Sequence, residues 1–139
     1  MISSNFQANR GKLPWPTERG TITSKFGSYT NPITKTQDIN IGIYITTIAN
    51  AEVRAVFEGE VTKVVAIPGA NRFVIVKHGN YFTVYLNLAD VSVNTGDKIL
   101  LKQTIGKVFT EKGAHTSILQ FQVYEGQNKL DPELWLSKM

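Results

Sequence analysis

Metal-binding and acid–base chemistry would have to come from very few side chains in this sequence. His78 and His115 are its two histidines, and it contains no cysteine. A catalytic zinc ion takes about three protein ligands and leaves one position open. The two histidines belong to no motif with ligand spacing, and lone histidines are usually surface or hydrogen-bonded residues. A zinc site built from both histidines and a carboxylate is a minor alternative. The residues by themselves predict no catalytic group, no metal ligand and no cofactor.

Other catalytic motifs are missing as well. Serine chemistry needs a hydroxyl activated by a His base, and the sequence has no Gly-x-Ser-x-Gly elbow. It also has no Gly-x-Gly-x-x-Gly segment and no P-loop. Glu58 and Glu60 form a candidate carboxylate pair, but the intervening Gly59 favours a solvated turn. These patterns indicate a domain that is not an enzyme.

The charge of the chain is mildly basic and dispersed. Lys and Arg number 15 against 11 Asp and Glu, which gives a net charge of +4. A nucleic-acid-binding domain would show a basic stripe or a stacking motif; neither is visible, so we expect no nucleic-acid partner. An anionic cell-wall polymer or an acidic protein face fits this charge better. The sequence has no run of about 18 apolar residues, so we expect no membrane span.

The elements that would position these residues read as all-β. Short β-branched and aromatic runs alternate with Gly, Asn and Asp turns, which is typical of strands joined by tight connections. Turns are predicted at Glu58-Gly59, at His78–Asn80 and at Asn94–Asp97. The predicted strands are Thr21–Lys25, Gly42–Thr46, Val53–Phe57, Glu60–Ile67, Phe73–His78, Phe82–Leu86, Lys98–Leu101, Lys107–Phe109 and Leu119–Tyr124.

The two ends of the chain carry weaker signals. Residues 1–12 read as a polar lead-in without an element of its own, and residues 13–139 as one domain. Asp131-Pro132-Glu133 predicts one short helical turn, because Asp caps a first turn and Pro suits its first position. Leu134 and either Trp135 or Leu136 are expected to pack back on the core. The start has no signal-peptide pattern, so an exported protein would carry further sequence on the N-terminal side.

Several short segments follow one another in a fixed order, among them Leu-Pro-Trp-Pro near the start, Val-Ile-Val-Lys-His-Gly-Asn, and Val-x-x-Gly-x-x-Ile followed by Gln-x-Ile-Gly. This ordered set resembles the LytM domain of the lysostaphin-type peptidases over residues 13–136. The resemblance implies an antiparallel β-sandwich, the barrel-sandwich hybrid of the duplicated-hybrid-motif type. The segments are Leu13–Pro16, Gly20–Gly27, Glu52–Val61, Val74–Asn80, Val93–Ile99, Gln103–Gly106 and Leu130–Pro132.

Active members of that family cleave peptide crosslinks of peptidoglycan with zinc, and the resemblance maps their site onto this chain. The ligand motif H-x-x-x-D falls on Asn40 to Tyr44, with its glycine at Gly42. The Y-x-H-L motif places Asn87 at the catalytic His. The H-x-H motif falls on Ile118 and Gln120. All five metal or catalytic positions are therefore changed, to residues that are poor ligands and poor bases.

The pattern is similar to the degenerate LytM domains of EnvC-type murein hydrolase activators. Segments 13–16, 54–61, 67–71 and 130–136 fit that group in particular. The resemblance implies a pseudoenzyme of the periplasm, acting in cell division, whose groove binds and activates a cell-wall amidase (an N-acetylmuramoyl-L-alanine amidase). A signal sequence and an N-terminal coiled coil would then lie outside this chain. The implied partner-binding groove comprises Asn40, Ile41, Tyr44, His78, Asn87, Gln120 and Tyr124, with Ile118 at a vacated position.

Alternatives stay open at this point. The groove could hold peptidoglycan itself, or the chain could be a zinc endopeptidase with a relocated site. Tyr44 and Ile118 could simply fill the vacated metal pocket, and His78 could serve only its hairpin turn. The stretch Val93–Val108 also resembles biotinyl and lipoyl carrier hairpins, but no modifiable lysine stands at a hairpin tip.

Overall fold

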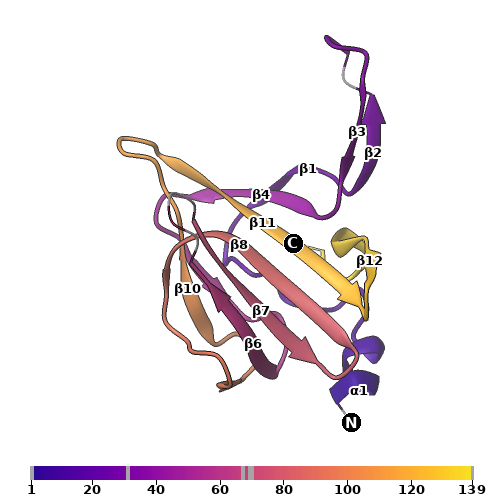
Figure 1. The fold of residues 1–139 in the computed structure, drawn as a ribbon, viewed down its shortest axis with the longest axis vertical. Coiled ribbons are helices and arrows are strands. Elements are labelled where there is room, and N and C mark those ends of the chain that lie inside the picture. Colours follow the sequence, from indigo (N-terminus) through magenta and orange to yellow (C-terminus); the bar gives the residue numbers. More distant parts are fainter. Residues whose placement is uncertain (1, 31, 67, 69–70, 139) are drawn as a thin grey trace.

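The computed structural model describes residues 2–30, 32–66, 68 and 71–138, and it is nearly all β (Figure 1). Within these residues, ten strands form one sheet and two more form a separate ribbon. The predicted all-β antiparallel class is confirmed. No helix in the described ranges is long and apolar enough to cross a membrane. Ile67, Gly69 and Ala70, which belong to one predicted strand and one family segment, lie outside the described residues.

The main layer of the sheet is antiparallel throughout. Its order is β1-β4-β11-β8-β7-β6-β9, and β12 pairs with β11. Alternate residues of β4 and β11 are buried, so one face packs on the core and the other stays open. The strands are β1 (Thr21–Ser24), β4 (Ile43–Ile48), β6 (Gly59–Val65), β7 (Arg72–His78), β8 (Tyr81–Val91), β9 (Lys98–Ile99), β11 (Thr116–Glu125) and β12 (Asn128–Leu130).

The second layer forms because β8 changes partners along its length. Its first part pairs with β7 and β11, while residues 88–91 pair with β10 (Thr104–Val108). β10 in turn pairs with β5 (Glu52–Arg54). The change occurs around Asn87, whose φ of 73° is left-handed, and such an irregularity bends a strand.

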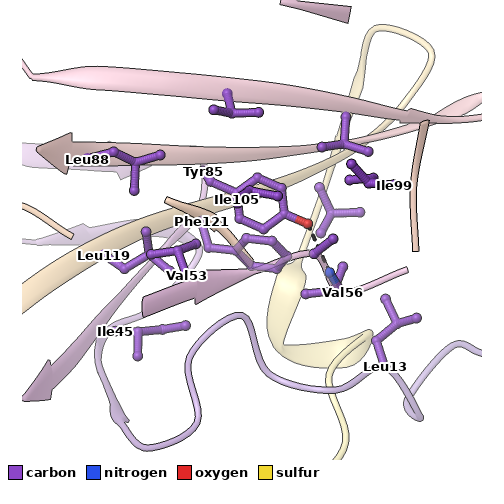
Figure 2. Packing of buried hydrophobic residues seen from close by; sticks show 14 of the residues in the cluster. Leu13, Ile45, Val53, Val56, Tyr85, Leu88, Ile99, Ile105, Leu119 and Phe121 are labelled. Atoms are coloured by element: carbon purple, nitrogen blue, oxygen red, sulfur yellow. Dashed lines mark hydrogen bonds between the residues drawn. The ribbon is translucent and has the colours of Figure 1, made fainter. Parts of the chain in front are cut away.

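The core fills the space between the two layers with β-branched, leucine and aromatic side chains (Figure 2). Tyr85 and Phe121 are fully buried neighbours with ring centroids 5.4 Å apart. The Tyr85 hydroxyl accepts a hydrogen bond of 3.1 Å from the backbone N–H of Val56, and Figure 2 shows this bond crossing the core. The buried phenol thus keeps a partner, as a polar group in an apolar core requires.

The N-terminal segment differs from the sequence-based expectation. Ile2–Ala8 forms helix α1, and its Phe6 is fully buried. Phe6 stacks on His78, Tyr81 and Trp135 at centroid distances of 4.8, 4.9 and 5.0 Å. The expectation that residues 1–12 carry no element is therefore wrong: a single aromatic anchor holds a helix there. The domain boundary at residue 13 stays a prediction.

Most of the other predicted elements are present with shifted ends. Each of the nine predicted strands overlaps a strand or strand end, and the hairpin turn after His78 is two residues long. Asp131 caps the 3₁₀ turn η1 (Pro132–Leu134) by accepting from the Glu133 N–H. Trp135 and Leu136 are buried, but Leu134 is 54% exposed, so it does not pack on the core as expected.

A two-stranded ribbon projects from the body beside β4 (Figure 1). It consists of β2 (Gly27–Thr30) and β3 (Gln37–Asn40), paired antiparallel. Sequence patterns did not predict these strands because none of their described side chains is buried; Ile39 is 72% exposed. The ribbon ends at Asn40, so it leads directly into the predicted groove.

Candidate functional site

The changed metal and catalytic positions come together on the open face of the sheet. Tyr44 on β4 lies directly opposite Gln120 on β11, and Gln120 is also opposite Leu86 on β8. Ile118 precedes Gln120 by two residues and shares its face, as the alternation of a strand requires. Asn40 ends β3, and Gly42 then brings the chain into β4.

Three adjoining hollows follow this face and form what we call the groove. The first has a volume of about 240 Å³, the second about 180 Å³ and the third about 570 Å³. Gln120 is shared by the first two, and Phe73 and Leu86 by the last two. Together the groove residues are Ile39–Tyr44, Thr62, Lys63, Asn71–Phe73, Ile75, Phe82, Val84, Leu86, Asn87, Gln120–Gln122, Tyr124 and Gly126.

The two asparagines at changed positions are held in place by hydrogen bonds. The Asn40 amide donates to the Ser24 hydroxyl at 2.6 Å and to the Lys25 carbonyl at 3.0 Å. The Asn87 amide donates to the Ile118 carbonyl at 2.7 Å and its oxygen accepts from Asn71 at 2.5 Å. Both side chains therefore act as structural links in the groove wall.

Tyr44 lines the groove, and Ile118 lies outside its lining on the same open face of the sheet. Tyr44 is 36% exposed and Ile118 is 41% exposed. Neither fills a sealed former metal pocket, which was the alternative for these two residues. Ile41, 38% exposed, also lines the groove, as does Tyr124, whose hydroxyl donates to Gln122 at 2.8 Å.

His78 does not belong to the groove, which corrects its assignment there. The side chain is fully buried on the core side of β7. Its Nδ1 lies 2.7 Å from the Glu58 carbonyl and its Nε2 lies 2.8 Å from the Thr83 hydroxyl. Because a carbonyl only accepts, Nδ1 carries the proton of the neutral ring. The alternative that His78 serves only its hairpin turn is also insufficient. Its side chain contacts the Glu58 carbonyl and the Thr83 hydroxyl of β8, and it stacks on Phe6 of α1.

The environment of His78 makes it a weak base. Burial lowers the pKa of His78 to about 4, and the hydrogen bond to the Glu58 carbonyl opposes this to a smaller extent. His115 cannot join it at a metal. The register places His78 and Glu125 opposite Tyr81, and ten further residues of strand separate His115 from that point, about 30 Å.

The residues present do not fit a zinc ion. Tyr44, Ile118 and Gln120 are neutral, and the Asn40 and Asn87 amides are already hydrogen-bonded. Among the described residues, no three His, Cys, Asp or Glu side chains lie close enough to share a metal ion. The chemistry of this groove is therefore that of hydrogen bonding and apolar contact.

Sequence reasoning missed the apolar floor of the groove. Phe73, Ile75 and Leu86 contribute it from β7 and β8. The only charged side chains among the described residues that line the groove are Lys63 and Arg72, and both are basic. The signal was present in Phe73–Val76 of β7, a run that is apolar on both faces of the strand.

Comparison with known proteins agrees with this geometry. The model of peptidase family M23 matches residues 38–132, more than half of the chain. The uncharacterized protein NMB1333 of Neisseria meningitidis serogroup B is 29% identical over 136 residues, which cover 96% of this chain and 22% of that protein. The chain thus spans about a fifth of the length of this relative.

Solved structures share the fold at low sequence identity. Helicobacter pylori Csd3 aligns with a TM-score of 0.76 at 18% identity, over 91% of this chain and 35% of that chain. A zinc-containing peptidase from Vibrio cholerae gives 0.74 at 23% identity, over 89% and 40%. A chain of the SpoIIQ–SpoIIIAH pore-forming complex gives 0.70 at 22% identity, over 93% of both chains. Because this family model covers more than half of the chain, the chain belongs to peptidase family M23.

Proposed function

We propose that this chain is a non-catalytic member of its family that binds a cell-wall amidase through the groove and activates it. The observation that carries the proposal is the state of the five former metal and catalytic positions. They line or adjoin an open groove, they are neutral, and two of them are tied into hydrogen bonds of the wall. The activity implied is that of a docking surface in the periplasm, with hydrolysis left to the partner.

The composition of the groove supports a protein partner. An apolar floor with amide groups along one side and basic residues at the rim is typical of a protein interface. The partner segment that fits would present apolar side chains to Phe73 and Leu86 and acidic ones to Lys63 and Arg72. A chain of the same fold occurs within the SpoIIQ–SpoIIIAH complex, so this fold is compatible with a role in protein assembly.

The test is activation of an amidase from the same organism, followed as dye release from labelled cell wall. Tyr44→Ala and Gln120→Ala should each lower activation by about tenfold, because each removes a side chain that lines the groove. Both side chains are at least partly exposed and neither is in the core, so both variants should keep the wild-type melting temperature.

Lys107→Gln is the matched control, because Lys107 is exposed on β10 in the second layer. It should activate as wild type does. If the two groove variants activate as fully as this control does, the groove is not the contact surface and the proposal fails.

A second candidate is a peptidoglycan-binding module, favoured by the amides that gather in the groove. Asn40, Asn71, Asn87, Gln120 and Gln122 all line it, and amides suit the hydrogen-bonding groups of a stem peptide or amino sugar. Sedimentation with purified sacculi distinguishes the two functions. Sacculus binding that Gln120→Ala abolishes, with no amidase binding, would favour this candidate.

A further inference from the structure

A further hollow lies outside the groove, and its lining contains charged residues of both signs. It has a volume of about 530 Å³ and lies where the end of β4 meets β5 and β10. None of its residues lines the groove. We call it the mixed-charge hollow, and its residues are Glu18, Arg19, Thr47, Ile48, Asn50, Ala51, Glu52, Arg54, Lys102 and Thr104.

Hydrogen bonds hold the first two of its three cationic residues, Arg19 through its backbone and Arg54 through its side chain. The Arg19 carbonyl accepts hydrogen bonds from the buried hydroxyls of Thr17 and Thr47, at 2.8 and 2.7 Å. Arg54 is half-buried, and its Nε donates to the Trp15 carbonyl at 2.9 Å. Such anchoring lowers the entropy lost when a ligand orders these side chains.

The third cation, Lys102, stands at a strained position. Its φ is +66°, and its N–H donates to the Ala55 carbonyl at 2.9 Å. Asn50, also in the lining, has a φ of +60°. Left-handed backbone at a residue other than glycine costs energy and tends to gather at functional sites. Of the four such residues in the described ranges, two line this hollow and Asn87 lines the groove.

The charges of the hollow define the ligand. Arg19, Arg54 and Lys102 face the same space as Glu18 and Glu52, and no ion pair among the described residues joins them. A phosphate or sulfate would be repelled by the two carboxylates. A molecule with both a carboxylate and an ammonium group finds partners of opposite sign for each group in this lining.

We propose that the mixed-charge hollow binds a zwitterionic amino acid or short peptide. Its carboxylate would be held by Arg19, Arg54 and Lys102, and its ammonium group by Glu18 and Glu52. Arginine favours this role because its planar guanidinium binds a carboxylate through two parallel hydrogen bonds. The volume lies in the range of small-molecule sites, roughly 300–1,000 Å³.

The test is titration of the ¹⁵N-labelled chain with the dipeptide alanyl-alanine, followed by amide shifts in two-dimensional NMR. Shifts should concentrate at residues 18–19, 47–54 and 102–104. Alanyl-alanine amide lacks the carboxylate and N-acetyl-alanyl-alanine lacks the ammonium group. Each should bind about tenfold more weakly, the expected loss for one charged hydrogen-bonding group.

Lys102→Gly is the sharpest variant, because glycine adopts a φ of +66° without strain. It should keep or raise the melting temperature and weaken dipeptide binding about tenfold. Lys129→Gln, on β12, removes a charge elsewhere and should bind as wild type does.

Equal binding by Lys102→Gly and wild type, equal shifts with inorganic phosphate, or shifts that avoid the hollow would each overturn the proposal. Because the readout involves no amidase, these results stand apart from the test of the groove.

Discussion

Gly42 is the residue of the H-x-x-x-D segment that matches the family motif, whereas Asn40 and Tyr44 replace its two metal ligands. A Cβ at this position would lie 2.4 Å from the Phe121 carbonyl oxygen, so the approach of β4 to β11 requires glycine. Asn40 and Tyr44 lie on the open side of the same turn, where the fold sets no such limit. The glycine therefore belongs to the packing of the sheet, and its presence says nothing about metal binding.

His78 makes stability depend on pH. The folded state holds the neutral ring down to a pKa of about 4, whereas the unfolded chain takes up a proton near the ordinary value of 6.5. Between these values the unfolded state binds more protons, so stability falls as pH falls from 6.5 to 4. Below that window both states are protonated, and the full loss is roughly 3 kcal/mol.

Urea unfolding between pH 4 and pH 8 measures this slope. His115 is exposed and is the other histidine, so His115→Gln is the matched control and should keep the wild-type pH dependence. His78→Gln should flatten it between pH 5 and 6.5, where carboxylates contribute little. An unchanged slope in His78→Gln would show that the buried histidine is not the titrating group.

At the scale of elements, hydrophobic periodicity predicted the strands that pack apolar side chains and missed the segments that bury few of them. The nine predicted strands each place apolar residues in the core or on the groove floor, and this is the pattern that sequence reveals. β2 and β3 pair with each other in a separate ribbon, and none of their described side chains is buried, so no apolar period marks these strands. Helix α1 has Phe6 as its single buried apolar residue, too few for a helical pattern.

The docking of α1 rests on that one side chain. Phe6 packs against His78, Tyr81, Trp135 and, edge-on at 5.6 Å, Phe57. Phe6→Ala should therefore lower the free energy of unfolding by about 3–5 kcal/mol, the usual cost of removing a buried aromatic ring. Ile2→Ala, in the same helix at a residue 40% exposed, should cost under about 1 kcal/mol.

Urea unfolding followed by tryptophan fluorescence measures both variants, since Trp135 is in the cluster. Hydrogen exchange at Gly11 and Leu13, whose amides donate to the Trp135 carbonyl, reports local release of the segment. Equal stability of the two variants would mean that α1 is not anchored through Phe6.

At the scale of the whole molecule, the sequence indicated which strands line the open face but not which side chains form its floor. Asn40, Tyr44, Asn87 and Gln120, which the family resemblance singled out, line adjoining hollows because motif spacing fixes the strand register. It misplaced His78, since one residue of strand decides which face a side chain takes. The apolar floor and the mixed-charge hollow join residues far apart in the chain, and no local pattern indicates such a meeting.

The pairing register of β4 and β11 allows a test of whether Asn40, Tyr44 and Gln120 occupy the positions of zinc ligands. Tyr44 and Gln120 are direct cross-strand partners, with Cβ atoms expected about 5 Å apart, and Asn40 lines the same hollow. The triple substitution Asn40→His, Tyr44→Asp and Gln120→His should therefore create a three-ligand site with one open position. Zinc at a hundredfold excess over its Kd should stabilise this variant by about 2.7 kcal/mol.

Metal analysis after dialysis and the thermal shift with zinc measure this gain, and the double variant Asn40→His, Tyr44→Asp is the matched control. One zinc ion per triple variant, with none retained by the double variant or by wild type, would show that the groove keeps the metal geometry without the ligands. Wild-type protein that retains one zinc ion would contradict the assignment of the chain as non-catalytic. A triple variant that retains none would mean that these three positions do not converge, because histidine and aspartate within bonding distance of one point bind zinc whatever the rest of the groove has become.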